Sequence, residues 1–229
     1  MPMQTIDKDQ YQALRQGATV LAADAYGDKV LELRSGQLMK LFRRKRLFSS
    51  ALFYPYSRRF VANVQRLSGL NIPTVSELSE YRIPSISRSA VKYKPLSGDS
   101  LEALIRQRRF DRQRIEQFAI FLAKLHRLGV YFRSVHLGNV VATPDNRLGL
   151  IDVADMKFYR RRLSASRCAR NMRHVCRYRE HVAALFPAGR RGWFLDSYLQ
   201  ALQLNDRQRR RYEAVISRQL DQHLVAAHQ

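Results

Sequence analysis

Two side chains with hard oxygen donors flank a short segment in the second half of the chain. Asn139 precedes an apolar run at 140–142, and Asp152 follows another at 148–151. Pro144-Asp145-Asn146 lies between the two runs and predicts a hairpin turn. Mg²⁺ takes oxygen ligands, usually one or two carboxylates with phosphate oxygens and water. Because a carboxamide and a carboxylate at opposite ends of one short hairpin can face the same ion, we expect a metal site here.

The part of the chain before this hairpin, residues 1–96, predicts a small lobe of strands with one helical stretch. This part contains short apolar runs separated by turns, and two of the turns contain glycine. Such a pattern favours strands and a hairpin. We expect these strands at 18–23, 29–34, 37–42, 74–78 and 89–93. Between residues 43 and 70 apolar side chains recur every three or four positions, which predicts one or two helices.

The remaining part, residues 97–229, predicts a helical lobe. Pro95 and Gly98 interrupt the chain near residue 96, and Asp99 or Ser100 can cap a following helix. Further helices are expected at 112–128, 164–185 and 192–228. The hairpin within residues 131–153 is the one interruption, so we expect the chemistry there. A small mixed lobe followed by a helical lobe defines an α+β fold.

The composition favours anionic partners. Lys and Arg number 41 against 19 Asp and Glu, which gives a formal net charge of +22. Nucleic acid, anionic lipid headgroups and phosphorylated substrates would all be attracted to such a surface. Cys168 and Cys176 are too far apart on one predicted helix to form a disulfide, so a reduced compartment is expected. A polar start without an apolar signal region, and no long apolar run, predict a cytoplasmic protein that is soluble or peripheral.

The segment from Gly129 to Asp152 resembles the catalytic loop and metal-binding hairpin of protein kinases. In kinases a catalytic Asp is followed five positions later by an Asn ligand, and an Asp ligand lies beyond the hairpin. Asn139 and Asp152 match the two ligand positions, and Ser134 stands five residues before Asn139, where the catalytic Asp is expected.

Several segments resemble one branch of this superfamily, the bacterial lipopolysaccharide core kinases that phosphorylate Kdo or heptose sugars. These segments are Leu125–Val130, His136–Asn139, Asn71–Val75, Tyr93–Gly98 and Arg170–Met172. Residues 132–139, together with 40–46, resemble the subgroup called toluene tolerance proteins. The resemblance spans roughly residues 25 to 200 and implies a two-lobed protein-kinase-like fold with ATP and Mg²⁺ as cofactors.

The resemblance also implies roles for individual residues, with three departures from the family pattern. Lys40 matches the phosphate-binding lysine, but residues 43–70 contain no carboxylate to pair with it. The glycine-rich loop is reduced to Gly27. The catalytic positions are Ser134, in place of the Asp, and His136, which either ties down the loop or replaces the base.

Three functions of different classes follow. The first is ATP- and Mg²⁺-dependent phosphorylation of a lipopolysaccharide inner-core sugar, or another anionic glycolipid, at the inner face of the inner membrane. The second is a pseudokinase that binds nucleotide or acts as a scaffold in envelope assembly. The third, a basic nucleic-acid-binding protein, ranks lowest because no nucleic-acid motif accompanies the charge. The run Arg43-Arg44-Lys45-Arg46 beside apolar residues is either a peripheral membrane contact or a solvated helix face. The sequence indicates no particular oligomeric state.

Overall fold

The computed structural model describes residues 2–43 and 55–227, which fall into two compact units. Unit 1 comprises Met1–Leu96 together with Asp152–Ala154, and unit 2 comprises Ser97–Ile151 and Asp155–Gln229. The three residues Asp152–Ala154 therefore make most of their contacts with the N-terminal half of the chain.

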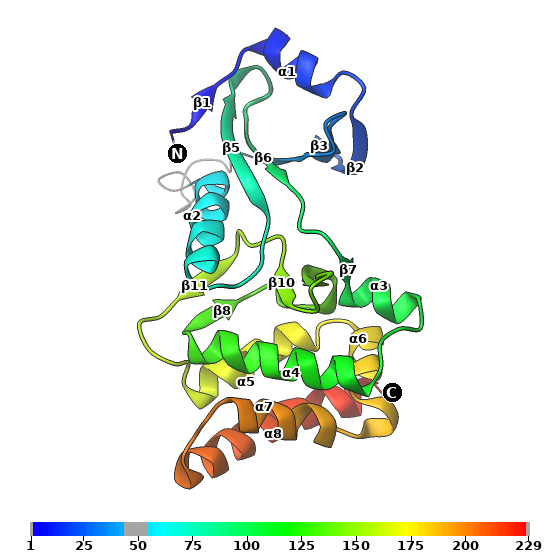
Figure 1. Ribbon diagram of the computed structural model, residues 1–229, viewed down its shortest axis with the longest axis vertical. Coiled ribbons are helices and arrows are strands. Elements are labelled where there is room, and N and C mark those ends of the chain that lie inside the picture. Colours follow the sequence, from blue (N-terminus) through cyan, green and yellow to red (C-terminus); the bar gives the residue numbers. More distant parts are fainter. Residues whose placement is uncertain (1, 44–54, 228–229) are drawn as a thin grey trace. The chain divides into compact units, whose positions relative to one another are not determined.

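Unit 1 is built on one six-stranded sheet of order β1-β5-β6-β4-β3-β2 (Figure 1). Its elements are β1 (Gln4–Thr5), α1 (Lys8–Arg15), β2 (Thr19–Asp24), β3 (Gly27–Glu32), β4 (Leu38–Arg43), α2 (Tyr56–Gly69), β5 (Ser76–Ile83), a 3₁₀ turn (Pro84–Ile86) and β6 (Arg88–Lys94). All neighbouring strands are antiparallel except β1 and β5. On β4, Lys40 lies opposite Val30 of β3 and Val91 of β6, so it occupies an interior strand.

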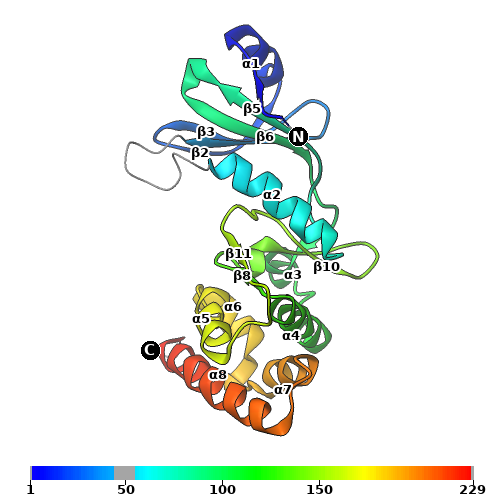
Figure 2. The same cartoon turned by 90° about the vertical axis from the view of Figure 1, so that its left-hand side faces the viewer.

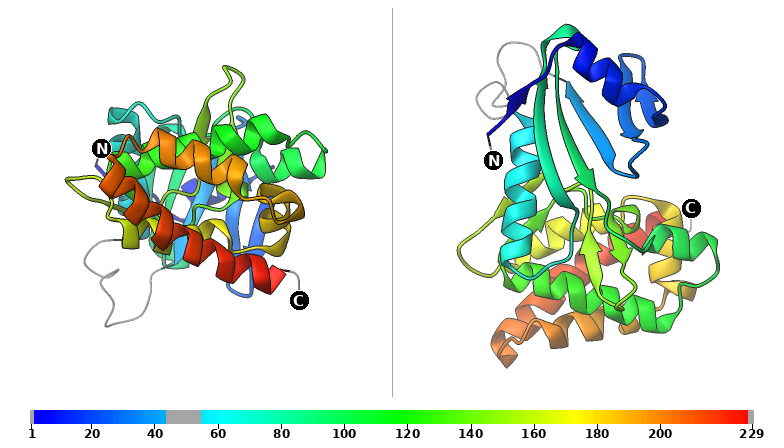
Figure 3. Two further views of the ribbon diagram at one scale, coloured as in Figure 1. Left: turned by 90° about the horizontal axis from the view of Figure 1, so that it is seen from below. Right: turned by 45° about the horizontal axis from the view of Figure 1, so that its top comes forward.

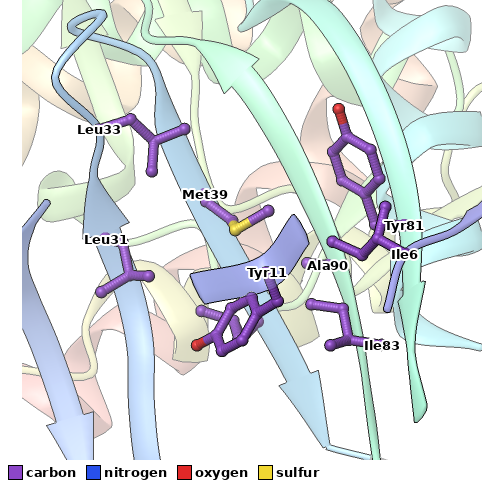
Figure 4. Close-up of a cluster of buried hydrophobic side chains, with 9 residues drawn as sticks. Ile6, Tyr11, Leu31, Leu33, Met39, Tyr81, Ile83 and Ala90 are labelled. Carbon is purple, nitrogen blue, oxygen red and sulfur yellow. The ribbon is translucent and has the colours of Figure 1, made fainter. Parts of the chain in front are cut away.

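One face of this sheet is covered by α1. The alternation of a strand places Met39 and Leu41 on one face of β4 and Lys40 and Phe42 on the other. Met39 and Leu41 join Tyr11 of α1 in a buried cluster drawn in Figure 4. The other members of the cluster are Ile6, Leu31, Leu33, Tyr81, Ile83 and Ala90. This core lies on one face of β4, and Lys40 lies on the opposite face.

That opposite face is covered by α2, which lies across the sheet from α1 in Figure 2. The Phe60 ring of α2 lies 6.0 Å from the ring of Phe42 and 5.4 Å from that of Tyr93. Its neighbours Val64 and Leu67, one turn apart, are also buried. The helix therefore packs along the side of β4 that carries Lys40.

In the described part of unit 2, five short strands and two helices come first, and four helices follow (Figure 3). The first group is β7 (Asp99–Ser100), α3 (Leu101–Arg106), α4 (Arg112–Arg127), β8 (Val130–Phe132), β9 (Val140–Ala142), β10 (Leu148–Leu150) and β11 (Met156–Phe158). The second is α5 (Ala165–Val175), α6 (Arg179–Leu185), α7 (Gly192–Ala201) and α8 (Asp206–Ala227), with 3₁₀ turns at Leu137–Asn139 and Pro187–Gly189. Helix α4 packs on α7, and α5 packs on α8.

The hairpin predicted near the middle of the chain is formed by β9 and β10. Leu148 pairs with Ala142 and Leu150 with Val140, and β7 adds a third strand beside β9. Gly98, just before β7, has a φ of +125°, and a β-carbon there would lie 2.0 Å from the carbonyl oxygen of Ala142. Only glycine allows the chain to approach β9 this closely.

The α+β class, with a β-rich N-terminal part and a helical C-terminal part, is confirmed. The strands predicted in residues 18–42 are present, with Arg43 as the last residue of β4 rather than the first of a helix. Residues 44–54 of the predicted 43–70 helix, and Arg44-Lys45-Arg46 with them, lie outside the described residues. No helix in the described ranges is long and apolar enough to cross a lipid bilayer.

Three predictions about helices were incomplete. Residues 8–15 form a helix where only strands were expected. The predicted helix 164–185 is two helices, α5 and α6, and the predicted helix 192–228 is likewise α7 and α8.

Candidate functional site

The loop that carries Ser134 and Asn139 is closed by hydrogen bonds to one carbonyl group. The carbonyl oxygen of Ser134 accepts from the backbone N–H of His136 at 2.9 Å and from Asn139 Nδ2 at 2.9 Å. Asn139 in turn accepts, through its own carbonyl, the N–H of Ile151 at the end of β10. The loop is therefore fixed at both ends, and Asp152 follows directly on Ile151.

The side chain of Asn139 is oriented by its neighbours. Its amide nitrogen bonds to the Ser134 carbonyl and lies 3.1 Å from Nε2 of His136. Among the described residues, its carboxamide oxygen makes no hydrogen bond, although the residue is only 8% exposed. A fixed, unengaged amide oxygen is the donor that a magnesium ion takes from asparagine.

In unit 1, Asp152 is paired with Lys40. Lys40 Nζ lies 2.5 Å from Asp152 Oδ1, and the lysine side chain is the more buried of the two, at 18% exposure against 47%. Asp152 has a φ of +54°, in the left-handed region that Asp tolerates better than most residues. Such backbone conformations gather at functional sites, where the surrounding structure holds them.

Helix α2 holds the segment around Asp152 through an asparagine. Asn63 is buried, and its Nδ2 donates to the carbonyl oxygen of Val153 at 2.7 Å. The absence of a carboxylate in residues 43–70 had left Lys40 without a predicted partner. In the structure that partner is Asp152 itself, while the buried Glu80 of β5 lies 3.5 Å from Nε of Arg58 on α2.

Gly27 begins β3 in a tight turn with a φ of +104°. The N–H of Tyr26 is bound by the Asp24 carboxylate at 2.9 Å. The carbonyls of Tyr26 and Asp28 both accept from the guanidinium of Arg88. This turn directs its polar groups to other side chains, so its geometry differs from a loop of free N–H groups that cradles phosphate. The assignment of Gly27 to nucleotide binding stays a prediction.

Ser134 and His136 occupy different surroundings within the loop. The Ser134 hydroxyl makes no hydrogen bond with the described residues, and the side chain is partly buried. The His136 ring is stacked on His181 at 6.1 Å between centroids and meets the edge of Tyr178 at 5.2 Å. These ring contacts support the reading of His136 as a residue that ties down the loop.

A buried histidine, His181, lies beside Glu102, whose carboxylate is also close to Gly138. His181 is 1% exposed, and Nε2 lies 4.0 Å from the Glu102 carboxylate. Neither ring nitrogen makes a hydrogen bond with any residue that the structure describes. A β-carbon on Gly138 would lie 2.5 Å from that same carboxylate. Burial lowers the pKa of His181, so the ring is neutral near pH 7.

The residues that anchor the loop from behind had no role assigned from the sequence. Asn171 of α5 donates to the carbonyl oxygen of Phe132 at 2.8 Å and accepts from Nε2 of His126. The other ring nitrogen of His126 lies 2.6 Å from the Tyr198 hydroxyl. Because Asn171 Oδ1 accepts at Nε2, Nδ1 is unprotonated and accepts the Tyr198 proton. This buried chain fixes the end of β8 two residues before Ser134.

The two cysteines take no part in this chemistry. Cys168 and Cys176 are free and buried, and burial raises the pKa of each thiol to about 12. Thiols held in the protonated form are poor nucleophiles, so the two side chains contribute to packing.

The β-rich unit carries Lys40 on an interior strand, and the helical unit carries the loop and the hairpin, which is the α+β content that the resemblance to protein kinases predicted.

Comparisons with known proteins give no sequence match and a distant structural similarity. No protein-family model matches the chain, and no curated protein matches it. One similar solved structure is described as a divergent kinase that lacks the glycine-rich loop and regulates membrane ultrastructure of the Toxoplasma parasitophorous vacuole. The two chains are 15% identical, with 96% of this chain and 80% of that chain covered and a TM-score of 0.43.

Proposed function

We propose that the protein binds ATP with Mg²⁺ and transfers a phosphoryl group slowly to a hydroxyl of an anionic glycolipid, such as a lipopolysaccharide inner-core sugar. The observation that carries the nucleotide part is the Lys40–Asp152 ion pair, formed by an aspartate in a left-handed conformation. In kinase-like proteins the strand lysine contacts the phosphates and the aspartate beyond the hairpin binds the metal, so this contact brings residues of both kinds together.

The donor set fits Mg²⁺ and phosphate. Asp152 offers a half-exposed carboxylate, Asn139 an unengaged carboxamide oxygen, and Lys40 an ammonium group. All are hard or cationic groups of the kind that Mg²⁺ and phosphate oxygens prefer. The nucleotide would supply the transferred phosphoryl group, and the protein would supply position and charge.

The slow rate follows from Ser134. A serine hydroxyl can accept a hydrogen bond from an acceptor hydroxyl but is too weak a base to hold its proton near pH 7. General-base assistance is worth roughly 10²- to 10⁴-fold, while phosphoryl transfer depends mainly on positioning and charge. A protein with the positioning groups and without the base would be slow rather than inert.

The glycolipid acceptor and the location at the inner membrane surface rest on the resemblance and on the charge. A formal net charge of +22 suits an acceptor that is itself anionic.

The second candidate is a pseudokinase. It is favoured by the turn at Gly27, where the Tyr26 N–H is held by the Asp24 carboxylate rather than free for phosphate. Such a protein would bind nucleotide or a partner without transfer.

The experiment that separates the two is a paired measurement on the wild-type protein. ATP binding is measured with Mg²⁺ and with EDTA, and phosphate transfer is then measured with core oligosaccharide from ³²P-labelled ATP. Magnesium-dependent binding with labelled oligosaccharide supports the kinase, and binding without label supports the pseudokinase. The proposal as a whole fails if ATP does not bind under either condition.

A further inference from the structure

A basic pocket in unit 2 lies outside the proposed nucleotide site. It has a volume of about 510 Å³ and is lined by three separate segments of the chain. The segments are the end of β8 with Arg133, the strand β11 with Lys157, and one face of α5. Its cationic side chains are Arg133, Lys157, Arg167, Arg170, Arg173 and Arg177.

Helix α5 has a buried side and an exposed side, and its arginines lie on the exposed side. Its buried side carries small and apolar residues, including Cys168 and Met172, and its exposed side carries the arginines at positions 167, 170 and 173. Residues three apart lie on one face of a helix, so these guanidinium groups form a row. An ordinary solvated helix face would mix both signs of charge, and this one does not.

The positive charges of the pocket are poorly compensated. The carboxylate of Asp155 lies 3.5 Å from Arg133, with both side chains about half exposed. Within the described ranges, no carboxylate lies within 4.0 Å of Lys157, Arg170 or Arg173. Arg167 stacks on the Tyr159 ring at 4.2 Å, a contact that positions the guanidinium and leaves its charge unneutralised.

The pocket also has a defined aromatic wall. The edge of the His174 ring meets Tyr131 with ring centroids 6.1 Å apart, and Tyr131 is buried. Burial, with Arg133 and Arg177 nearby, lowers the pKa of His174, and only Asp155 acts against this. The ring is therefore neutral at pH 7 and reports on the electrostatics of the pocket.

We propose that this pocket binds a compact ligand that carries two or more phosphate groups. Guanidinium groups bind phosphate through paired N–H donors, and several of them converging from different segments exceed what one phosphate can use. The proposal rests on unit 2 alone and goes beyond the proposed nucleotide site.

The position of the pocket gives such a ligand a role in that chemistry. Arg133 directly precedes Ser134, and its N–H is bound by the carbonyl of Asp155 at 3.1 Å. Lys157 follows two residues later on β11, which pairs with β8. A polyphosphorylated ligand in the pocket would therefore contact residues on both sides of the loop that carries Ser134.

The test uses tripolyphosphate as the probe, with orthophosphate for comparison at the same ionic strength, by isothermal titration calorimetry. We expect tripolyphosphate to bind at least about tenfold more tightly than orthophosphate, since a second phosphate adds charge-assisted contacts. The variant Arg170→Gln with Arg173→Gln should lose about tenfold or more in affinity. The matched control is Arg207→Gln with Arg210→Gln, which removes the same charge from the exposed start of α8.

A second readout distinguishes a built site from a diffuse positive surface. Tripolyphosphate should raise the pKa of His174, followed by NMR, because bound anions offset Arg133 and Arg177. Equal losses in the two double variants, or an unchanged His174, would overturn the proposal. Loss of ATP binding in Lys40→Ala with retention of tripolyphosphate binding would show that the two sites are separate.

Vesicles identify the source of the phosphates. Vesicles containing phosphatidylinositol bisphosphate are compared with phosphatidylserine vesicles of equal surface charge. Preference for the bisphosphate, lost in the Arg170/Arg173 variant, assigns the ligand to a lipid headgroup. Binding of tripolyphosphate alone assigns it to a soluble compound, and failure of both probes overturns the site.

Discussion

At the scale of single residues, Asp152 combines two features that a purely structural aspartate does not need. It adopts a left-handed conformation, and it forms the ion pair with Lys40 while remaining 47% exposed. The backbone conformation costs free energy, and a glycine or asparagine would meet it as well. The backbone conformation alone therefore does not account for an aspartate here, and its charge is the feature that the contact with Lys40 uses.

This argument predicts the effect of Asp152→Asn. The variant should fold normally, because Asn tolerates the same conformation, and it should lose magnesium-dependent ATP affinity by at least about tenfold. The affinity is measured by calorimetry with Mg²⁺ and with EDTA, and the fold by circular dichroism. Asp196→Asn on the exposed side of α7 serves as the control. Equal ATP affinity in Asp152→Asn and wild type would exclude Asp152 as a ligand.

Ser134 allows a gain of function to be predicted. If only the base is missing from an otherwise competent loop, Ser134→Asp should raise phosphate transfer, within the roughly 10²- to 10⁴-fold range of general-base catalysis. Ser134→Asn is the matched control, because it has nearly the same size and no basic oxygen. Transfer is measured with labelled ATP and core oligosaccharide. If Ser134→Asp lowers transfer and His136→Ala abolishes it, His136 has replaced the base. No transfer by any of the three variants or by the wild type would identify a pseudokinase.

At the scale of secondary-structure elements, the loop depends on the buried chain His126–Asn171–Phe132. Burial lowers the pKa of His126 from 6.5 to about 4, since a charged imidazolium would lose its hydration there. The unfolded chain therefore binds the proton more readily than the folded one. Stability is complete above pH 6.5, falls as the pH decreases from there to about 4, and then falls no further on account of this group.

The corresponding prediction concerns urea unfolding at several pH values. Between pH 7.5 and 4, His126 should reduce the free energy of unfolding by about 3 kcal/mol, because each unit of pKa shift is worth about 1.4 kcal/mol. In His126→Gln this part of the pH dependence should disappear, and the free energy of unfolding at pH 7.5 should be lower than in the wild type. His223→Gln, at a partly buried position on α8, should retain most of it. A wild-type protein equally stable at pH 7.5 and pH 4.5 would contradict the burial argument.

The elements also show what the sequence could and could not predict. The sequence analysis did not predict where α1 and α8 begin, although each start has a capping pair of residues that can be recognised in the sequence. Asp7 and Gln10 form a reciprocal capping box, and Asn205 and Gln208 make the same exchange of hydrogen bonds. The break between α5 and α6 had no such signal, since Tyr178 caps α6 without a side-chain hydrogen bond.

The site was predictable only where its residues are close in sequence. Asn139 and Asp152 could be named as candidate ligands because one hairpin separates them. The Lys40–Asp152 pair spans 112 positions, and the bonds from Asn63 to Val153 and from Asn171 to Phe132 span 90 and 39. Local periodicity carries no information about such pairings, because they are fixed by how sheets and helices pack.

At the scale of the whole molecule, the formal net charge of +22 includes several separate groups of cationic residues. Some cations line the pocket around Arg170, others lie on the start of α8, and a further group is the run Arg43-Arg44-Lys45-Arg46. Of that run only Arg43 is described. Its guanidinium lies 3.6 Å from the Tyr26 ring centroid, and it lines a cavity of about 320 Å³ in unit 1 together with Arg82 and Arg88.

A comparison at constant net charge tests whether the run 43–46 contacts a membrane. Replacing Arg43, Arg44, Lys45 and Arg46 by Gln lowers the net charge by four, as does replacing Arg207, Arg209, Arg210 and Arg211. Long-range attraction to anionic vesicles is therefore reduced equally in both variants.

If the first run lies at the membrane surface, each of its charges adds about 1 kcal/mol of local attraction that the second set does not supply. The first variant should then dissociate from the vesicles at a much lower ionic strength than the second, as measured by co-sedimentation across a salt series. Because the screening length is about 10 Å at 0.1 M salt, the difference between the variants should shrink as salt is added. Identical salt profiles would mean that position does not matter, and that these four residues act only through the total charge.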